Sequence, residues 1–223
     1  MRDKVRDSIE MRIGGDFNIK QDPISISLIM LSLLVGSAIG VLAEETGFAL
    51  DGQMISIMLI GGLIFGIMLK MNENNVDIVD VSLTKDDLRK IFTFAVLGLG
   101  GVAMSQLVAG VLSSGLGLSS LTATLNDSLF YASVGFAEEI FFRYAVLLAF
   151  IHFGFGMYGS VAGVSLLFSL YHLGVYGTMP SALVAMFLGS VVLCTITIYS
   201  ERISPAMIAH GTWNFLVVLL GVF

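Results

Sequence analysis

The sequence predicts an all-α protein, a transmembrane bundle of seven or eight helices with its functional residues inside the bundle. Charged residues make up 13% of the 223 residues and hydrophobic residues 56%, whereas soluble domains carry about 25% charged residues. The mean hydropathy of +0.92 indicates that most of the chain cannot face water. Apolar runs that cross a bilayer must satisfy their backbone hydrogen bonds internally, so they form helices and not open sheets.

The sequence contains seven apolar segments when about 20 residues are taken as the length of one membrane-spanning helix. They are expected near residues 24–43, 54–69, 91–112, 127–150, 157–173, 181–199 and 204–222. Turn-forming and charged stretches separate the segments; the longest is MNENNVDIVDVSLTKDDLRK, after the second segment. We therefore expect a single transmembrane domain over residues 1–223.

The polar N-terminal segment, residues 1–22, lacks the early apolar core and cleavage site of a secretory signal, so the first helix is expected to stay as an anchor. Positive charge is concentrated before the first helix and around the second loop, in Arg2, Lys4, Arg6, Arg12, Lys20, Lys70, Lys85, Arg89 and Lys90. The positive-inside rule then puts the N-terminus in the cytoplasm. We expect a multi-pass protein of a prokaryotic plasma membrane.

Three charged residues interrupt the fourth apolar segment. Glu138, Glu139 and Arg143 lie in the stretch SVGFAEEIFFRYAVLLAF, and charges at bilayer depth cost several kcal/mol unless they pair or face a polar cavity. Residues four apart share a helix face, so Arg143 can reach back to Glu139. Glu138 is rotated away by about 100° and remains available for chemistry, unless all three form one packing cluster.

Two further segments carry polar residues at bilayer depth. His172 ends the run VSLLFSLYH, and His210 and Asn214 share one face of the helix in PAMIAHGTWNF. A single histidine near a helix end is more often a packing residue, but a set drawn from three helices favours a functional site. His152 is expected at an interface, and the lone Cys194 excludes both a disulfide framework and a cysteine zinc site.

These residues form three motifs in order on separate helices: Glu138-Glu139-x-x-x-Arg143, Phe168-x-x-x-His172 and His210-x-x-x-Asn214. The set resembles the signature of the CPBP intramembrane proteases, the CAAX protease and bacteriocin-processing or Abi family. The asparagine that ends the third motif makes the set most similar to the Ras-converting CAAX prenyl protease branch of that family. The resemblance implies an intramembrane endopeptidase that acts on membrane-associated or prenylated CAAX-type substrates, with its catalytic helices in residues 127–222.

The resemblance also implies a role for each residue. Glu138 and His172 would activate the attacking water, and His210 and Asn214 would stabilise the oxyanion. Glu139 and Arg143, with Phe168, would support the site from behind. No cofactor is expected under this mechanism, in which a glutamate and not a metal activates the water.

A zinc-dependent mechanism remains the main alternative. Glu138, His172 and His210 could supply the two histidines and one carboxylate of a catalytic zinc site. The His-Glu-x-x-His helix of common zinc proteases is absent from the sequence. With Glu138 as a ligand, only Glu139 would remain as a base, and we therefore favour the metal-free mechanism.

Two other classes of protein fit parts of the pattern. Buried carboxylates and histidines also occur in proton-coupled transporters, and Gly36-x-x-x-Gly40 and Gly62-x-x-x-Gly66 would suit a membrane scaffold. Neither explains all three motifs. The acidic residues are dispersed, and no basic face indicates nucleic acid as a partner.

Seven simple spans leave one conflict. They put His172 near the outer end of its helix and His210 near the cytoplasmic end of another, so the two residues would lie at different depths. The fifth segment must then be tilted or extended, or the following stretch LGVYGTMP must re-enter the membrane, or the boundaries must differ from those expected.

Overall fold

A computed structural model describes residues 24, 28, 83–112, 125–173 and 179–221, and every regular element in these ranges is a helix. The elements are α4 (Lys85–Leu112), α5 (Leu125–Glu139), the π-helix η1 (Ile140–Val146), α6 (Leu147–His152), α7 (Gly156–Tyr171), α9 (Pro180–Ser200) and α10 (Ser204–Leu220). The all-α class is thus confirmed for these residues. The predicted segments 24–43 and 54–69 lie outside the described residues, apart from Ile24 and Leu28.

The remaining five predicted segments coincide with these helices within a few residues, with one larger difference. The third begins at Lys85, several residues before the expected start near residue 91. Thr84 caps it: the backbone N–H of Asp87 donates to Thr84 Oγ1 at 3.2 Å, and the backbone N–H of Thr84 donates back to Asp87 Oδ2 at 3.0 Å. This capping box satisfies free N–H groups and lets the charged residues enter the first turns of α4.

Among the described helices, α4 (over Lys85–Val111) and α9 are long and apolar enough to cross a membrane, by length and composition. The apolar helices α7 and α10 are shorter. The total of seven or eight spans therefore stays a prediction.

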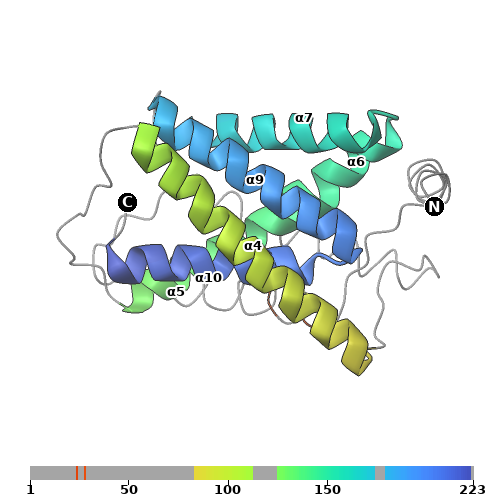
Figure 1. The fold of residues 1–223 in the computed structure, drawn as a ribbon, viewed down its shortest axis with the longest axis horizontal. Coiled ribbons are helices and arrows are strands. Elements are labelled where there is room, and N and C mark those ends of the chain that lie inside the picture. Colours follow the sequence, from red (N-terminus) through yellow and green to blue (C-terminus); the bar gives the residue numbers. More distant parts are fainter. Residues whose placement is uncertain (1–23, 25–27, 29–82, 113–124, 174–178, 222–223) are drawn as a thin grey trace, which may run out of the picture.

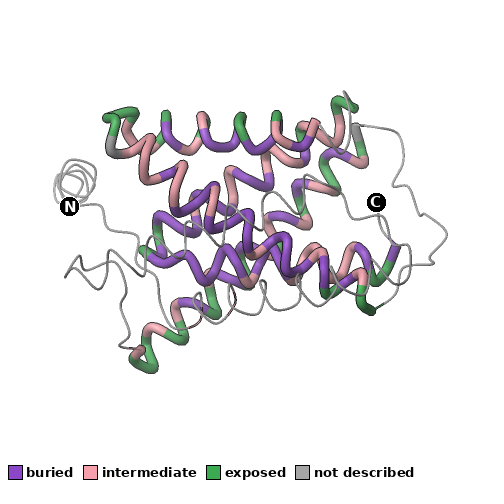
Figure 2. Tube along the Cα trace, turned by 180° about the vertical axis from the view of Figure 1, so that it is seen from behind, coloured by how far each residue is buried: buried purple, intermediate pink, exposed green. Residues whose placement is uncertain are grey.

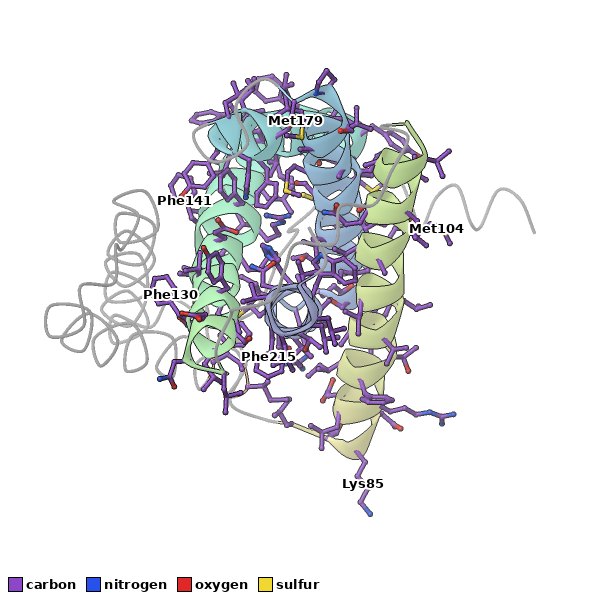
Figure 3. The ribbon with its side chains drawn as sticks, turned by 90° about the vertical axis from the view of Figure 1, so that its left-hand side faces the viewer. Lys85, Met104, Phe130, Phe141, Met179 and Phe215 are labelled. Carbon is purple, nitrogen blue, oxygen red and sulfur yellow. The ribbon has the colours of Figure 1, made fainter. Side chains whose placement is uncertain are left out.

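Helix α10 lies at the centre of the arrangement. Figure 3 shows it end-on, with α5 on one side and α4 on the other, and its most extensive contacts are with these two helices. Helix α9 packs against both α4 and α7, which lies along the edge of the bundle (Figure 1). Buried residues line the facing sides of the helices (Figure 2), and the largest apolar ones include Phe130, Ile140, Leu147 and Met207.

One ion pair joins two polar turns at the same end of the bundle. Arg202, in the turn between α9 and α10, lies with its Nη2 atom 3.1 Å from Asp87 Oδ1 in the first turn of α4. The predicted topology requires these two turns on the same side of the membrane. The orientation of that side, inferred from charge distribution, stays a prediction.

Two glycines bring α5 and α10 into close contact. A Cβ atom at Gly135 would lie 3.3 Å from the Cα of Gly211, and a Cβ atom at Gly211 would overlap the ring of Phe136. Side chains at these positions would push the two helices apart, and these helices carry the carboxylates and His210. Small residues therefore set the spacing on which the site depends.

We expect Gly211→Ala to lower the free energy of unfolding by about 1–3 kcal/mol, because the added methyl group overpacks the interface. Gly100→Ala is the matched control, since a Cβ there meets nothing within 4 Å and alanine is the better helix former. Thermal unfolding of both variants in detergent measures the difference. Equal melting temperatures for the two variants would contradict this account of the interface.

Candidate active site

The two carboxylates lie where the fourth helical segment changes its winding. Glu138 and Glu139 are the last residues of α5, and the π-helix η1 follows immediately and contains Arg143. Such π-helical turns are rare and often occur at functional sites. A uniform helix was expected over this segment, and hydropathy gives no sign of the wider turn because the extra residue is itself apolar.

The predicted ion pair on this helix is present. Arg143 Nε lies 3.1 Å from Glu139 Oε2, and both side chains are fully buried. The two charges therefore neutralise each other inside the bundle. As the helical geometry predicted, Glu138 is not part of this pair.

Glu138 faces two histidines from two other helices. Its Oε1 atom lies 3.8 Å from Nε2 of His172, and its Oε2 atom lies 3.6 Å from Nε2 of His210. All three side chains are buried. Both distances exceed that of a direct hydrogen bond, so the Glu138 carboxylate faces both Nε2 atoms without bonding directly to either.

His172 caps the C-terminal end of α7 and is oriented by its own helix. Its Nδ1 atom lies 2.8 Å from the backbone carbonyl oxygen of Phe168. A carbonyl oxygen only accepts hydrogen bonds, so Nδ1 carries the proton and donates it. In the neutral ring, Nε2 therefore presents its lone pair toward Glu138.

His210 is oriented by a carboxylate. Its Nδ1 atom lies 2.7 Å from Glu139 Oε1, so Glu139 contacts Arg143 with one oxygen and His210 with the other. Sequence reasoning assigned Glu139 to Arg143 alone. No local pattern could have revealed the second contact, because His210 lies 71 residues further along the chain.

Phe168 packs among these groups. The Arg143 guanidinium lies 4.5 Å from the centre of its ring, and the ring centres of His172, Phe142 and His210 lie at 4.4, 5.0 and 5.9 Å. A guanidinium over an aromatic face is stabilised by a cation–π interaction. Phe168 thus contacts both the buried ion pair and the two imidazoles.

Asn214 lies one turn beyond His210 on α10 and bonds to α5. Its Nδ2 atom donates to the backbone carbonyl of Tyr131 at 3.2 Å, seven residues before Glu138. It also lies against Gly135, where a Cβ atom would come within 3.0 Å of Nδ2. One of its two amide hydrogens is therefore engaged by the backbone. Its predicted oxyanion role stays a prediction.

The conflict in depth between His172 and His210 is removed by the position of α7. Glu138 lies 16 residues before Gly154, in the α6–α7 turn, and His172 lies 18 residues after it, so the hairpin brings them level. Figure 1 shows that this turn extends further along the long axis than the turn between α9 and α10. Helix α7 has only 16 residues, about 24 Å, and at its end His172 faces the same Glu138 carboxylate as His210 does.

The Glu138 carboxylate and the two Nε2 atoms are the kinds of ligand that zinc binds. In each histidine Nδ1 is held by a hydrogen bond to an oxygen, which leaves Nε2 facing Glu138. As placed, however, no group of three or more His, Cys, Asp or Glu side chains among the described residues stands close enough to hold a metal ion.

Comparison with known proteins identifies the family. A family model described as type II CAAX prenyl endopeptidase Rce1-like matches residues 119–216. Over this range the chain is similar to the Rce1-like CAAX protease family, which supports membership of that family. The matched residues include all the site residues described above, and the predicted family is confirmed. No curated protein and no solved structure matches the chain.

Proposed function

We propose that this Rce1-like protein is an intramembrane endopeptidase that hydrolyses prenylated CAAX-type or related membrane-associated peptides. The observation that carries the proposal is the buried Glu138 carboxylate, which faces Nε2 of His172 and of His210 while the neighbouring Glu139 is neutralised by Arg143. The family match supports the reaction class, a protease. The helices α4 and α9 support a membrane location.

Peptide hydrolysis at this site follows from the position of Glu138. A water bound between Glu138 and His172 gives a proton to the carboxylate as its oxygen attacks the scissile carbonyl carbon. When the tetrahedral intermediate collapses, the carbon–nitrogen bond breaks and Glu138 returns the proton to the leaving amine. His210 and Asn214 lie on the next helix and would donate hydrogen bonds to the oxyanion.

The two mechanisms require different protonation of His210. Its Nδ1–H donates to Glu139, so donation to an oxyanion from Nε2 requires a ring that carries both protons. The zinc mechanism requires a neutral ring with a lone pair on Nε2. In that case Glu138, His172 and His210 would hold the ion, which would activate water and polarise the substrate carbonyl.

Purified protein in detergent should cleave a farnesylated CAAX peptide, with products identified by mass spectrometry. The same peptide without its farnesyl group is the matched control for substrate class, because the lipid delivers the peptide to the bilayer. If the protein cleaves neither this peptide nor any peptide in a panel of membrane-associated peptides, that result would contradict the protease proposal and favour a scaffold or transporter.

Adding a strong chelator to this assay tests the mechanism. Under the metal-free mechanism we expect the rate to be unchanged across the titration, because Glu138 activates the water directly. Loss of activity on chelation, followed by recovery on addition of zinc, would establish the zinc mechanism. That outcome would leave the protease assignment intact.

A further inference from the structure

We propose that Glu139 is a positioning residue that holds the Nδ1 proton of His210 and turns the Nε2 atom of this histidine toward Glu138. The orientation of the ring follows from the geometry alone, whereas its catalytic consequence rests on the proposed function. This assignment goes beyond the general support that the sequence suggested, because it gives Glu139 a specific partner on another helix.

The contact between the two residues is short and fully enclosed. Glu139 Oε1 lies 2.7 Å from His210 Nδ1, the length of a strong, charge-assisted hydrogen bond. Glu139 is completely buried and His210 is 6% exposed. Little water can therefore compete for the Nδ1 proton, and a rotated ring would leave a buried carboxylate oxygen without this partner.

Arg143 makes this arrangement possible. A carboxylate alone at this depth would be unstable as an anion, but Arg143 Nε contacts its second oxygen at 3.1 Å. The guanidinium is in turn held over the Phe168 ring at 4.5 Å. Glu139 thus lies between the guanidinium and His210, and its Oε1 atom is aimed at Nδ1.

The two histidines reach the same state by different means. Both have Nδ1 bonded to an oxygen that accepts, and both turn Nε2 toward Glu138. For His172 the acceptor is the backbone carbonyl of Phe168, which no side-chain substitution removes. For His210 the acceptor is a side chain, so only the state of His210 should depend on residue 139.

The proton positions can be read directly by long-range ¹H–¹⁵N NMR on the intact protein labelled with ¹⁵N-histidine and freed of metal with chelator. The chain has only three histidines, which substitution of each in turn assigns. We expect His210 of the wild type to carry a proton on Nδ1, in either a neutral or a doubly protonated ring. A His210 ring protonated only on Nε2 would overturn the proposal.

Two double variants then isolate the role of the acceptor. Glu139→Leu/Arg143→Met removes the whole ion pair and leaves no unpaired buried charge, a replacement that buried ion pairs often tolerate. Glu139→Gln/Arg143→Met is its matched control, because the amide keeps one acceptor oxygen at the same position. We expect His210 to lose its Nδ1 proton preference in the leucine variant and to keep it in the glutamine variant, with His172 unchanged in both.

An unaltered His210 signal in the leucine variant would overturn the proposal. If that variant fails to fold, the protonation of His210 in the wild-type spectrum decides for or against the proposal. With a cleaved peptide in hand, we also expect the leucine variant to lower kcat about 10- to 100-fold relative to the glutamine variant, with little change in KM. The NMR measurement needs no substrate. Failure of the protease proposal and failure of this inference are therefore distinguishable.

Discussion

Glu138→Gln is expected to abolish cleavage of a farnesylated peptide while leaving the protein folded. Glutamine has nearly the same shape, but its amide cannot accept the proton of the attacking water. Loss of a general base costs about 10²- to 10⁴-fold in rate, and Glu139 cannot replace it because its two oxygens are held by Arg143 and His210. Initial rates from mass spectrometry at saturating peptide measure the loss.

Asp86→Asn is the matched control for Glu138→Gln, since it makes the same chemical change at an exposed position in the first turn of α4. It should retain the wild-type rate. Equal melting temperatures for wild type and Glu138→Gln would show that the loss is catalytic. A Glu138→Gln variant with full activity would remove Glu138 from the mechanism under either the metal-free or the zinc proposal.

Hydropathy alone located the described helices because lipid-compatible composition extends over whole segments. It could not locate features that depend on one or two residues. The early start of α4 depends on the reciprocal bonds between Thr84 and Asp87, and the π-helix Ile140–Val146 differs from an α-helix only in its winding. Both are local hydrogen-bond choices inside a composition that remains the same.

The sequence singled out Glu138, Glu139 and Arg143 because charge at bilayer depth is costly wherever the chain places it; the full membership of the site stays a prediction. The separation of Glu138 from Glu139 also followed from helix rotation, and the ion pair of Arg143 bears it out. The contacts across helices did not follow. The bond from Glu139 to His210 and the bond from Asn214 to the Tyr131 carbonyl depend on how α10 packs on α5, which no spacing within one helix encodes.

Sequence reasoning also left the depth of His172 unresolved, because a hydropathy profile measures the length of a helix and not its offset along the bundle. The offset comes from the α6–α7 turn, whose glycines Gly154 and Gly156 have φ of 82° and 65°. These values lie in the left-handed region that glycine adopts without strain. Because of this turn, α7 starts further along the long axis of the bundle than α10 does (Figure 1). His172, at the other end of α7, therefore reaches the level of Glu138 and His210.

His172→Ala is expected to lower the rate nearly as much as Glu138→Gln, because both side chains contact the same water under the proposed mechanism. Nε2 of His172 lies 3.8 Å from Glu138 Oε1, and its Nδ1 is tied to a backbone carbonyl, so the ring is already aimed at the site. His152→Ala is the control, since that histidine ends α6 at the far end of the hairpin, and it should retain activity.

The combination of the two substitutions gives the sharper result. Residues that act as one unit show strongly non-additive losses, so Glu138→Gln/His172→Ala should be no slower than the worse single variant. Rates of the wild type, both single variants and the double variant, measured on the same farnesylated peptide, complete the cycle. Losses that multiply would show that His172 acts independently of the Glu138 water, for example by binding substrate, and a matching rise in KM for His172→Ala would confirm that separate role.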